Sequence, residues 1–197
     1  MERTRNILLC GVGGQGILLA SEIISSALMK AGFDVKQSEV HGMAQRGGSV
    51  ISHIRYGEKV YSPLIELGSA DIAASFELLE SLRYISYYNK DTRVIVNTQK
   101  ILPSPVSTGM DTYPPDVLEQ LKSRGLTVFP VDAFDIAKAA GETRAANVVL
   151  TGALSVFLPS VDEKIFLEVL EKRIPEKIRE VNIRAFLEGR KLIKKAF

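Results

Sequence analysis

The chain has 197 residues, 46% of them hydrophobic and 24% charged, a composition typical of a single soluble globular domain over residues 1–197. The formal net charge of +2 argues against a nucleic-acid-binding function. One cysteine and two histidines cannot supply the roughly four thiolates of an iron–sulfur cluster or the usual ligands of a zinc site, and no apolar run reaches the roughly 20 residues of a membrane span. We therefore expect no metal site, no membrane contact and a cytoplasmic location.

Strand and helix patterns alternate from the start of the chain. An apolar run at Ile7–Cys10 predicts a buried strand, and Ile17–Ala31 has helical periodicity that ends before Gly32. Phe33–Val40 predicts a second strand. The first 40 residues thus indicate a β-α-β unit.

A β-hairpin is predicted next. Ser49–Tyr56 alternates between apolar and polar residues, Gly57-Glu58 is a turn signal, and Lys59–Tyr61 resumes the alternation.

The remaining chain continues the alternation and ends in helices. The predicted elements are a strand at Asp71–Ser75, a helix through Leu78, Leu79 and Leu82, a strand at Arg93–Asn97, a proline-rich loop at Leu102–Pro115, a helix at Asp116–Arg124, a strand at Leu126–Val131, and helices at Ala145–Leu158, Asp162–Lys172 and Pro175–Lys195. This order predicts an α/β fold: a Rossmann-like, doubly wound, mostly parallel sheet with an added β-hairpin and C-terminal helices.

The last predicted helix has an apolar stripe. We expect this stripe to pack on the chain's own core, with a partner interface as the alternative. Its residues are Ile178, Val181, Ala185, Phe186, Leu192 and Ile193.

A glycine-rich turn joins the first strand to the first helix. Its residues Gly11, Gly13, Gly14, Gln15 and Gly16 match the G-x-G-x-x-G spacing, which lets backbone N–H groups at a helix start face an anionic group. We expect these residues to bind a cofactor or another anion. Two alternatives stay open. The glycines can serve the turn alone, or they can bind NAD, for which Glu39 is the acidic candidate toward the ribose.

The second motif, His41–Ser49, follows the second predicted strand. It should lie at the carboxyl edge of the sheet, where open α/β sheets bind ligands. His41 exchanges protons near neutral pH, Gln45 offers an amide, and Arg46 offers a planar fork for carboxylate or phosphate. Gly47 and Gly48 allow close backbone approach. A surface loop with glycine turns is the alternative.

Four other residues are expected to be structural. Cys10 ends an apolar strand with no basic neighbour and predicts a buried, inert thiol. His53 is expected to be an ordinary strand residue. Asn147 and Thr151 are expected to make helix-to-sheet hydrogen bonds.

Together, Gly11–Ser21 and Glu39–Ser49 resemble the gamma-type domain of the 2-oxoacid:ferredoxin oxidoreductases. Within that family the resemblance is strongest to its indolepyruvate branch, and Ala146–Leu154 resembles a later helix of the family. The resemblance implies a subunit of an enzyme that oxidatively decarboxylates 2-oxoacids, here aryl pyruvates, to acyl-CoA and CO2, with ferredoxin as electron acceptor and coenzyme A as cosubstrate.

The resemblance also implies a division of labour. The larger alpha subunit would carry thiamine diphosphate and the iron–sulfur clusters, and this chain would complete the active site without being active alone. His41, Gln45 and Arg46 would line that shared site. Two other functions remain open: a stand-alone NAD(P)-dependent oxidoreductase and a nucleotide-sensing module without chemistry.

Overall fold

The computed structural model describes residues 3–42 and 47–196. Its strands and helices, in chain order, are β1 Arg5–Val12, α1 Ile17–Lys30, β2 Asp34–His41, β3 Ser49–Gly57, β4 Ile72–Ser75, α2 Glu80–Arg83, β5 Arg93–Asn97, α3 Ser104–Ser107, α4 Val117–Ser123, β6 Thr127–Val131, α5 Ala133–Ala140, α6 Ala146–Ser155, α7 Glu163–Arg173 and α8 Glu176–Lys194, with single 3-10 turns at Ile85–Tyr87 and Thr143–Ala145.

These strands form one six-stranded sheet in the order β2-β3-β1-β4-β5-β6. β1, β4, β5 and β6 are parallel neighbours, whereas β3 runs antiparallel to both β1 and β2. The predicted α/β fold with a mostly parallel sheet, an added hairpin and C-terminal helices is confirmed.

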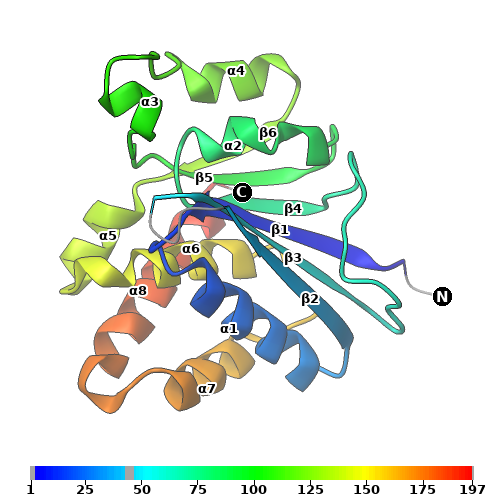
Figure 1. Cartoon of the computed structure of the whole chain (residues 1–197). Helices are drawn as coiled ribbons and strands as arrows, with labels where there is room; N and C mark the ends of the chain where they lie inside the picture. The colour runs from blue at the N-terminus through cyan, green and yellow to red at the C-terminus, as the bar shows by residue number, and fades with distance from the viewer. Residues whose placement is uncertain (1–2, 43–46, 197) are drawn as a thin grey trace.

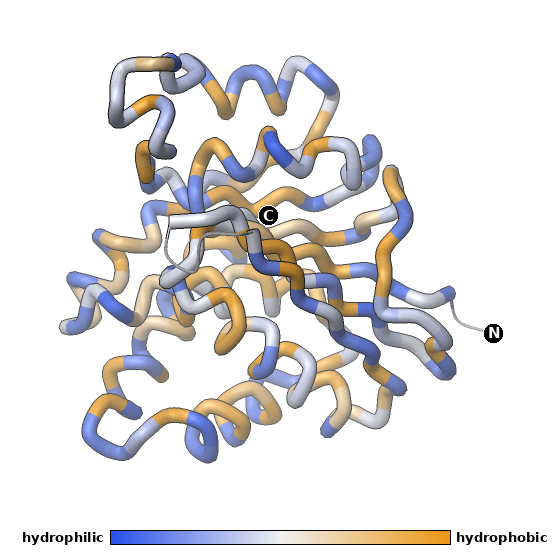
Figure 2. Tube along the Cα trace, in the orientation of Figure 1, coloured by the Kyte–Doolittle hydropathy of each residue, from blue (hydrophilic) through white to orange (hydrophobic). Residues whose placement is uncertain are grey.

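Helices cover both faces of the sheet (Figure 1). One face packs against α1, α5, α6, α7 and α8 around a core that includes Ile7, Leu9, Ile95 and Phe186. The other face packs against α4 and the segments beside α2, around Leu8, Val94 and Leu121. Figure 2 shows the apolar segments concentrated in the central strands. β1 is buried on both sides because successive side chains of a strand point to opposite faces.

The hairpin lies at other residues than predicted. β2 and β3 form it, with residues 42–48 as the connection. The prediction of a hairpin turning at Gly57-Glu58 is wrong, because Gly57 ends β3 and Lys59–Tyr61 forms no strand. Asp34 instead accepts a hydrogen bond from the Val60 N–H. The predicted β-α-β unit is also interrupted, since β3 lies between β1 and β2.

Other boundaries differ less. The helix expected around Leu82 is only the one turn of α2, and α3 lies inside the predicted proline-rich loop. Helix α5 was not predicted. Three residues of the predicted stripe of α8 pack on the core as expected, namely Ala185, Phe186 and Ile193, whereas Ile178 and Leu192 are each 37% exposed.

Candidate functional site

The glycine-rich turn lies at the carboxyl end of β1, and two of its residues adopt backbone conformations that favour glycine. Gly14 has a φ of +102°, and Gly16, the residue before α1, has a φ of +78°. Among the described residues no side chain caps the start of α1, and the first turn of this helix contains no acidic residue. Its first N–H groups, which have no intrahelical acceptor, and the positive end of the helix dipole are therefore available to an anion.

Gln15 fixes the shape of this turn. Its Oε1 accepts a hydrogen bond from the Val12 N–H at 2.8 Å. Its Nε2 donates to the carbonyl oxygen of Phe76 at 2.7 Å and to Oε1 of Gln99 at 3.3 Å. The Gln15 side chain thus connects the ends of β1, β4 and β5, so its observed role is structural support of the turn.

The second motif contacts the first directly. The N–H of Gly13 donates to the carbonyl oxygen of Gly48 at 2.8 Å, and the N–H of Gly42 donates to that of Ser49 at 2.8 Å. Gly47 has a φ of +78°. The two motifs therefore meet at the carboxyl edge of the sheet, which we call the glycine edge. Gln45 and Arg46 lie outside the described residues.

A buried carboxylate contacts the second motif from the sheet face opposite to α1. Glu80 is 3% exposed, accepts a hydrogen bond from the Ser49 hydroxyl, and pairs with Nε of Arg83 at 2.8 Å. The hydroxyl groups of Ser49 and Tyr84 lie 2.9 Å apart. These contacts fix the position of Ser49, which is the first residue of β3 and the last residue of the second motif.

A cavity of about 390 Å³ opens beside the glycine turn, at the carboxyl ends of β4 and β5. It lies outside the point where the strand order reverses, which is where open α/β sheets bind ligands. The residues that line it include Gly14, Gly16, Asn97, Gln99, Phe134, Arg144 and Asn147.

Arg144 and Asn147 bring polar groups to this cavity from near the start of α6. Asn147 donates from Nδ2 to the carbonyl oxygen of Gly16 at 3.3 Å. Arg144 is an exposed guanidinium that pairs with Glu142 at 2.8 Å, and this pairing lowers the pKa of Glu142 to about 2. The cavity therefore combines a helix start, an amide and a fixed cation, a set that suits a phosphate or carboxylate.

A second cavity, of about 290 Å³, lies on the β2 side of the glycine turn. Glu39 and His41 from the end of β2 line it, together with Gly13, Gly14 and Leu18. His41 is exposed, and its Nε2 lies 2.7 Å from Oε1 of Glu39. The structure thus places His41 at the glycine edge, as predicted.

Cys10 and His53 lie away from these cavities. Burial raises the pKa of the Cys10 thiol to about 12, consistent with the predicted inert thiol. His53 is a buried residue of β3 whose Nδ1 accepts the Ile65 N–H, and burial lowers its pKa.

The sequence did not identify Arg144 as a site residue, and it assigned Asn147 a structural hydrogen bond. Thr151 bonds within its own helix, to the carbonyl oxygen of Asn147, instead of to the sheet. Arg144 and Asn147 are more than 120 positions from the glycine turn, so no local spacing could connect them with it. In the described part of the chain, no helix is long and apolar enough to cross a membrane.

Known proteins are similar to this chain in sequence and in fold. Residues 6–192 match the family described as pyruvate ferredoxin/flavodoxin oxidoreductase. The chain is 43% identical over 196 residues to indolepyruvate oxidoreductase subunit IorB of Thermococcus kodakarensis, with 96% of each chain covered. The gamma subunit of the keto/oxoacid ferredoxin oxidoreductase of Geobacter sulfurreducens has a TM-score of 0.73 at 21% identity, covering 97% of this chain and 99% of its own.

A second solved structure is 2-oxoglutarate:ferredoxin oxidoreductase from Magnetococcus marinus with 2-oxoglutarate, coenzyme A and succinyl-CoA bound. Its TM-score is 0.78 at 23% identity, covering 99% of this chain and 32% of that one. At these identities the two structures show a shared fold. The family match and the full-length similarity to IorB show that this chain belongs to the pyruvate ferredoxin/flavodoxin oxidoreductase family.

Proposed function

We propose that this chain is the small subunit of a 2-oxoacid:ferredoxin oxidoreductase of the indolepyruvate type, in which residues 1–197 act as one domain. The enzyme converts an aryl pyruvate and coenzyme A to acyl-CoA and CO2 and passes the electrons to ferredoxin. The similarity to IorB over nearly the whole of both chains supports this subunit type and substrate class.

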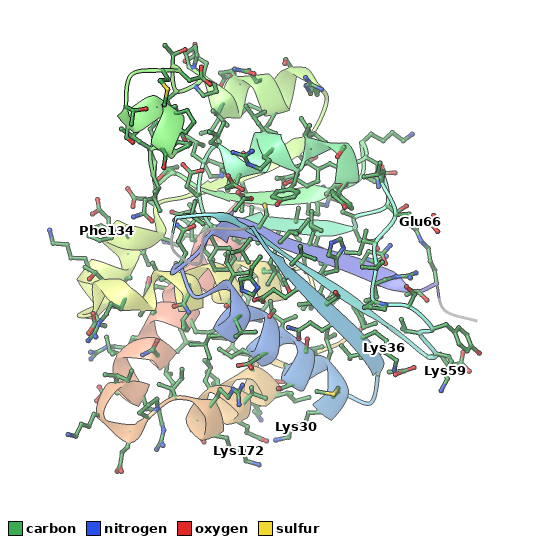
Figure 3. All side chains as sticks on the ribbon, in the orientation of Figure 1. Lys30, Lys36, Lys59, Glu66, Phe134 and Lys172 are labelled. Atoms are coloured by element: carbon green, nitrogen blue, oxygen red, sulfur yellow. The ribbon has the colours of Figure 1, made fainter. Side chains whose placement is uncertain are left out.

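The observation that carries the proposal is an apolar rim around the glycine edge. Four large side chains at this edge are substantially exposed. Leu18 (50%) lines the smaller cavity and Phe134 (42%) lines the larger one, whereas Val40 (53%) and Leu102 (54%) follow the lining residues Glu39 and Ile101 in sequence. Figure 3 shows Phe134 on α5, at the opposite end of the sheet from Lys59 and Glu66. Apolar side chains gathered around an open polar site favour a partner that closes it.

The redox cofactors belong to the partner in this proposal. Cys10 is the chain's one cysteine and is buried, so a cluster that needs about four thiolates does not fit this chain. The larger alpha subunit holds the iron–sulfur clusters and thiamine diphosphate, and ferredoxin docks on the assembled complex in the cytoplasm. This chain contributes binding and positioning groups.

We assign the phosphate end of coenzyme A to the larger cavity. Its phosphate groups match the start of α1 and the Arg144 guanidinium, and Asn147 offers an amide. When bound, coenzyme A supplies the thiol that accepts the acyl group. Gly11, Gly13, Gly14 and Gly16 let the backbone approach it, while Gly47 and Gly48 shape the neighbouring loop. We assign substrate binding in the shared site to His41, Gln45 and Arg46, as the family resemblance implies.

The test is 2-oxoacid-dependent reduction of an artificial electron acceptor with coenzyme A supplied. The chain is assayed alone and after anaerobic co-expression with its candidate thiamine diphosphate and iron–sulfur partner. We expect activity only in the pair, with preference for indolepyruvate or phenylpyruvate, and a raised apparent KM for the anionic substrate in Arg46→Ala. An inactive complex with an intact partner would contradict the proposal, and unchanged kinetics would remove Arg46 from the site.

A further inference from the structure

Two buried carboxylates lie behind the glycine edge, beside the core on the sheet face opposite to α1. Glu77 is 1% exposed and Glu80, the first residue of α2, is 3% exposed. Within the part of the chain that the structure describes, neither residue lines one of the two cavities at the glycine edge. A ligand in those cavities would therefore not contact them, and any effect on the reaction passes through other residues.

Glu77 fixes the position of Glu80. Its Oε2 accepts a hydrogen bond from the Glu80 N–H at 3.0 Å. Its Oε1 accepts the Ile101 N–H at 3.0 Å and the Tyr113 hydroxyl at 2.7 Å. With three donors around it, Glu77 connects the start of α2 to the segment after β5.

Glu80 in turn binds the last residue of the second motif. Its Oε2 accepts the Ser49 hydroxyl, and its Oε1 pairs with Nε of Arg83 at 2.8 Å. The hydroxyl groups of Ser49 and Tyr84 lie 2.9 Å apart. Because the single hydroxyl proton of Ser49 points to Glu80, Tyr84 is the donor in this bond. The Ser49 side chain is thus fixed both as a donor and as an acceptor.

Ser49 is the point at which the connection between β2 and β3 enters the sheet. It pairs with Val12 of β1, and its carbonyl oxygen accepts the Gly42 N–H at 2.8 Å. The connection contains Gln45 and Arg46 in its sequence. The position at which this connection ends is therefore set by Glu80.

A buried ion pair adds little to stability compared with apolar side chains of similar size, so stability alone does not explain this arrangement. We infer that Glu80 is a positioning residue for the 2-oxoacid: through Ser49 and Tyr84 it fixes the second motif and so determines the affinity of the assembled enzyme for this substrate. The inference rests on the proposed function, which assigns substrate binding to residues of that motif. It goes further because Glu80 itself contacts no substrate.

Steady-state kinetics of the assembled enzyme test this inference with Ser49→Ala and Glu80→Gln. We expect each change to raise the apparent KM for the 2-oxoacid about tenfold, because a hydrogen bond to a charged group is lost. The KM for coenzyme A should stay unchanged, since the Gln15 hydrogen bonds still hold the glycine turn. The double variant should raise the 2-oxoacid KM no further than either single variant, because both changes remove the same bond. Ser49→Thr keeps the hydroxyl and should keep the wild-type KM.

Ser81→Ala is the matched control. Ser81 is fully buried next to Glu80, and its hydroxyl donates to the carbonyl oxygen of Leu78. The same atom is removed from the same helix, and we expect both KM values to stay unchanged. A general loss of stability would lower the amount of active enzyme without changing KM. An unchanged 2-oxoacid KM in Ser49→Ala and Glu80→Gln, or an equal rise in Ser81→Ala, would overturn the inference.

Amide hydrogen exchange in the free full-length chain gives a readout that does not depend on activity. The Gly42 N–H reports on the motif, because it donates to the Ser49 carbonyl oxygen. We expect its exchange to become about tenfold faster or more in Ser49→Ala and Glu80→Gln and to stay unchanged in Ser81→Ala. Unchanged exchange in the first two variants would overturn the inference.

The two proposals fail in different ways. An active wild-type complex whose Ser49→Ala and Glu80→Gln variants keep the wild-type KM contradicts this inference alone. An inactive wild-type complex contradicts the proposed function, and the exchange of the Gly42 amide then decides whether Glu80 fixes the motif.

Discussion

At the scale of single residues, the structure gives Arg144 the most specific predicted role, which is binding a phosphate group of coenzyme A. Its guanidinium pairs with Glu142 and lines the larger cavity, and no residue near it in sequence indicates a binding role. We predict that Arg144→Ala raises the apparent KM for coenzyme A about tenfold in the assembled enzyme, because one charge-assisted contact to phosphate is lost. Steady-state kinetics with varied coenzyme A provide the measurement. Arg124→Ala, at an exposed arginine after α4, is the control, and an equal effect of both variants would contradict the assignment.

Gly16 tests the link between the glycine turn and α6. A Cβ at Gly16 would lie 2.5 Å from Nδ2 of Asn147, and the residue has a φ of +78°. Gly125 has the same φ with no atom within 4 Å of a Cβ. Both alanine variants carry a backbone cost of about 1–2 kcal/mol. We predict that Gly16→Ala lowers the free energy of unfolding by about 1–2 kcal/mol more than Gly125→Ala. Equal free energies of unfolding for the two variants in urea titration would contradict the prediction and would show that the Asn147 side chain moves aside without loss of stability.

Cys10 reports on the packing of β1. Since desolvation raises the pKa of its thiol to about 12, almost no thiolate is present at pH 8, and the side chain is inaccessible. We predict that a thiol reagent labels the native protein at pH 8 far more slowly than the protein in denaturant. Rapid labelling of the native chain at low reagent concentration would contradict the buried position.

At the scale of elements, α6 and α8 pack with their backbones in close approach. A Cβ at Gly152 would overlap the carbonyl oxygen of Phe186, and one at Gly189 would overlap that of Val149. Alanine normally stabilises a helix by about 1 kcal/mol relative to glycine. Here we predict the opposite sign, with Gly152→Ala lowering the free energy of unfolding by about 3 kcal/mol.

Ala139→Gly on the exposed face of α5 is the control for that change. It should cost about 1 kcal/mol from helix propensity alone. A Gly152→Ala variant as stable as wild type in denaturant titration would show that the two helices separate without loss.

Some strand and helix boundaries can be predicted from sequence patterns and others cannot. Arg93–Asn97 was predicted to the residue, because a buried strand reads as a continuous apolar run. The predicted position of the hairpin is wrong because Gly57-Glu58 is as strong a local turn signal as residues 42–48, which connect β2 and β3. Only the pairing of the strands in the sheet shows which of the two segments is the hairpin turn. Helix α5 has a capping residue at its start, since Asp132 accepts the Asp135 N–H, and a glycine just past its end, Gly141. Its eight residues lie between the predicted strand at Leu126–Val131 and the predicted helix at Ala145–Leu158, and the sequence pattern alone does not predict it.

At the scale of the whole molecule, the two glycine-containing motifs were expected at one edge of the sheet, and the Gly13–Gly48 hydrogen bond joins them there. Arg144 and the exposed rim could not be expected, because tertiary packing alone brings α5 and the start of α6 to that edge. The exposure of Leu18 and Leu102 likewise depends on how the chain folds, since either residue would fit a core.

The central claim is that the glycine edge faces the larger subunit. It is tested most directly by the affinity between the two purified chains, measured for single aspartate variants at each end of the sheet. Tyr61 (89% exposed) and Leu67 (66%) lie in the segment between β3 and β4, at the opposite end. We predict that Leu18→Asp and Leu102→Asp weaken assembly about tenfold or more, whereas Tyr61→Asp and Leu67→Asp leave it unchanged. The reverse pattern would contradict the claim and would place the partner on the far edge of the sheet.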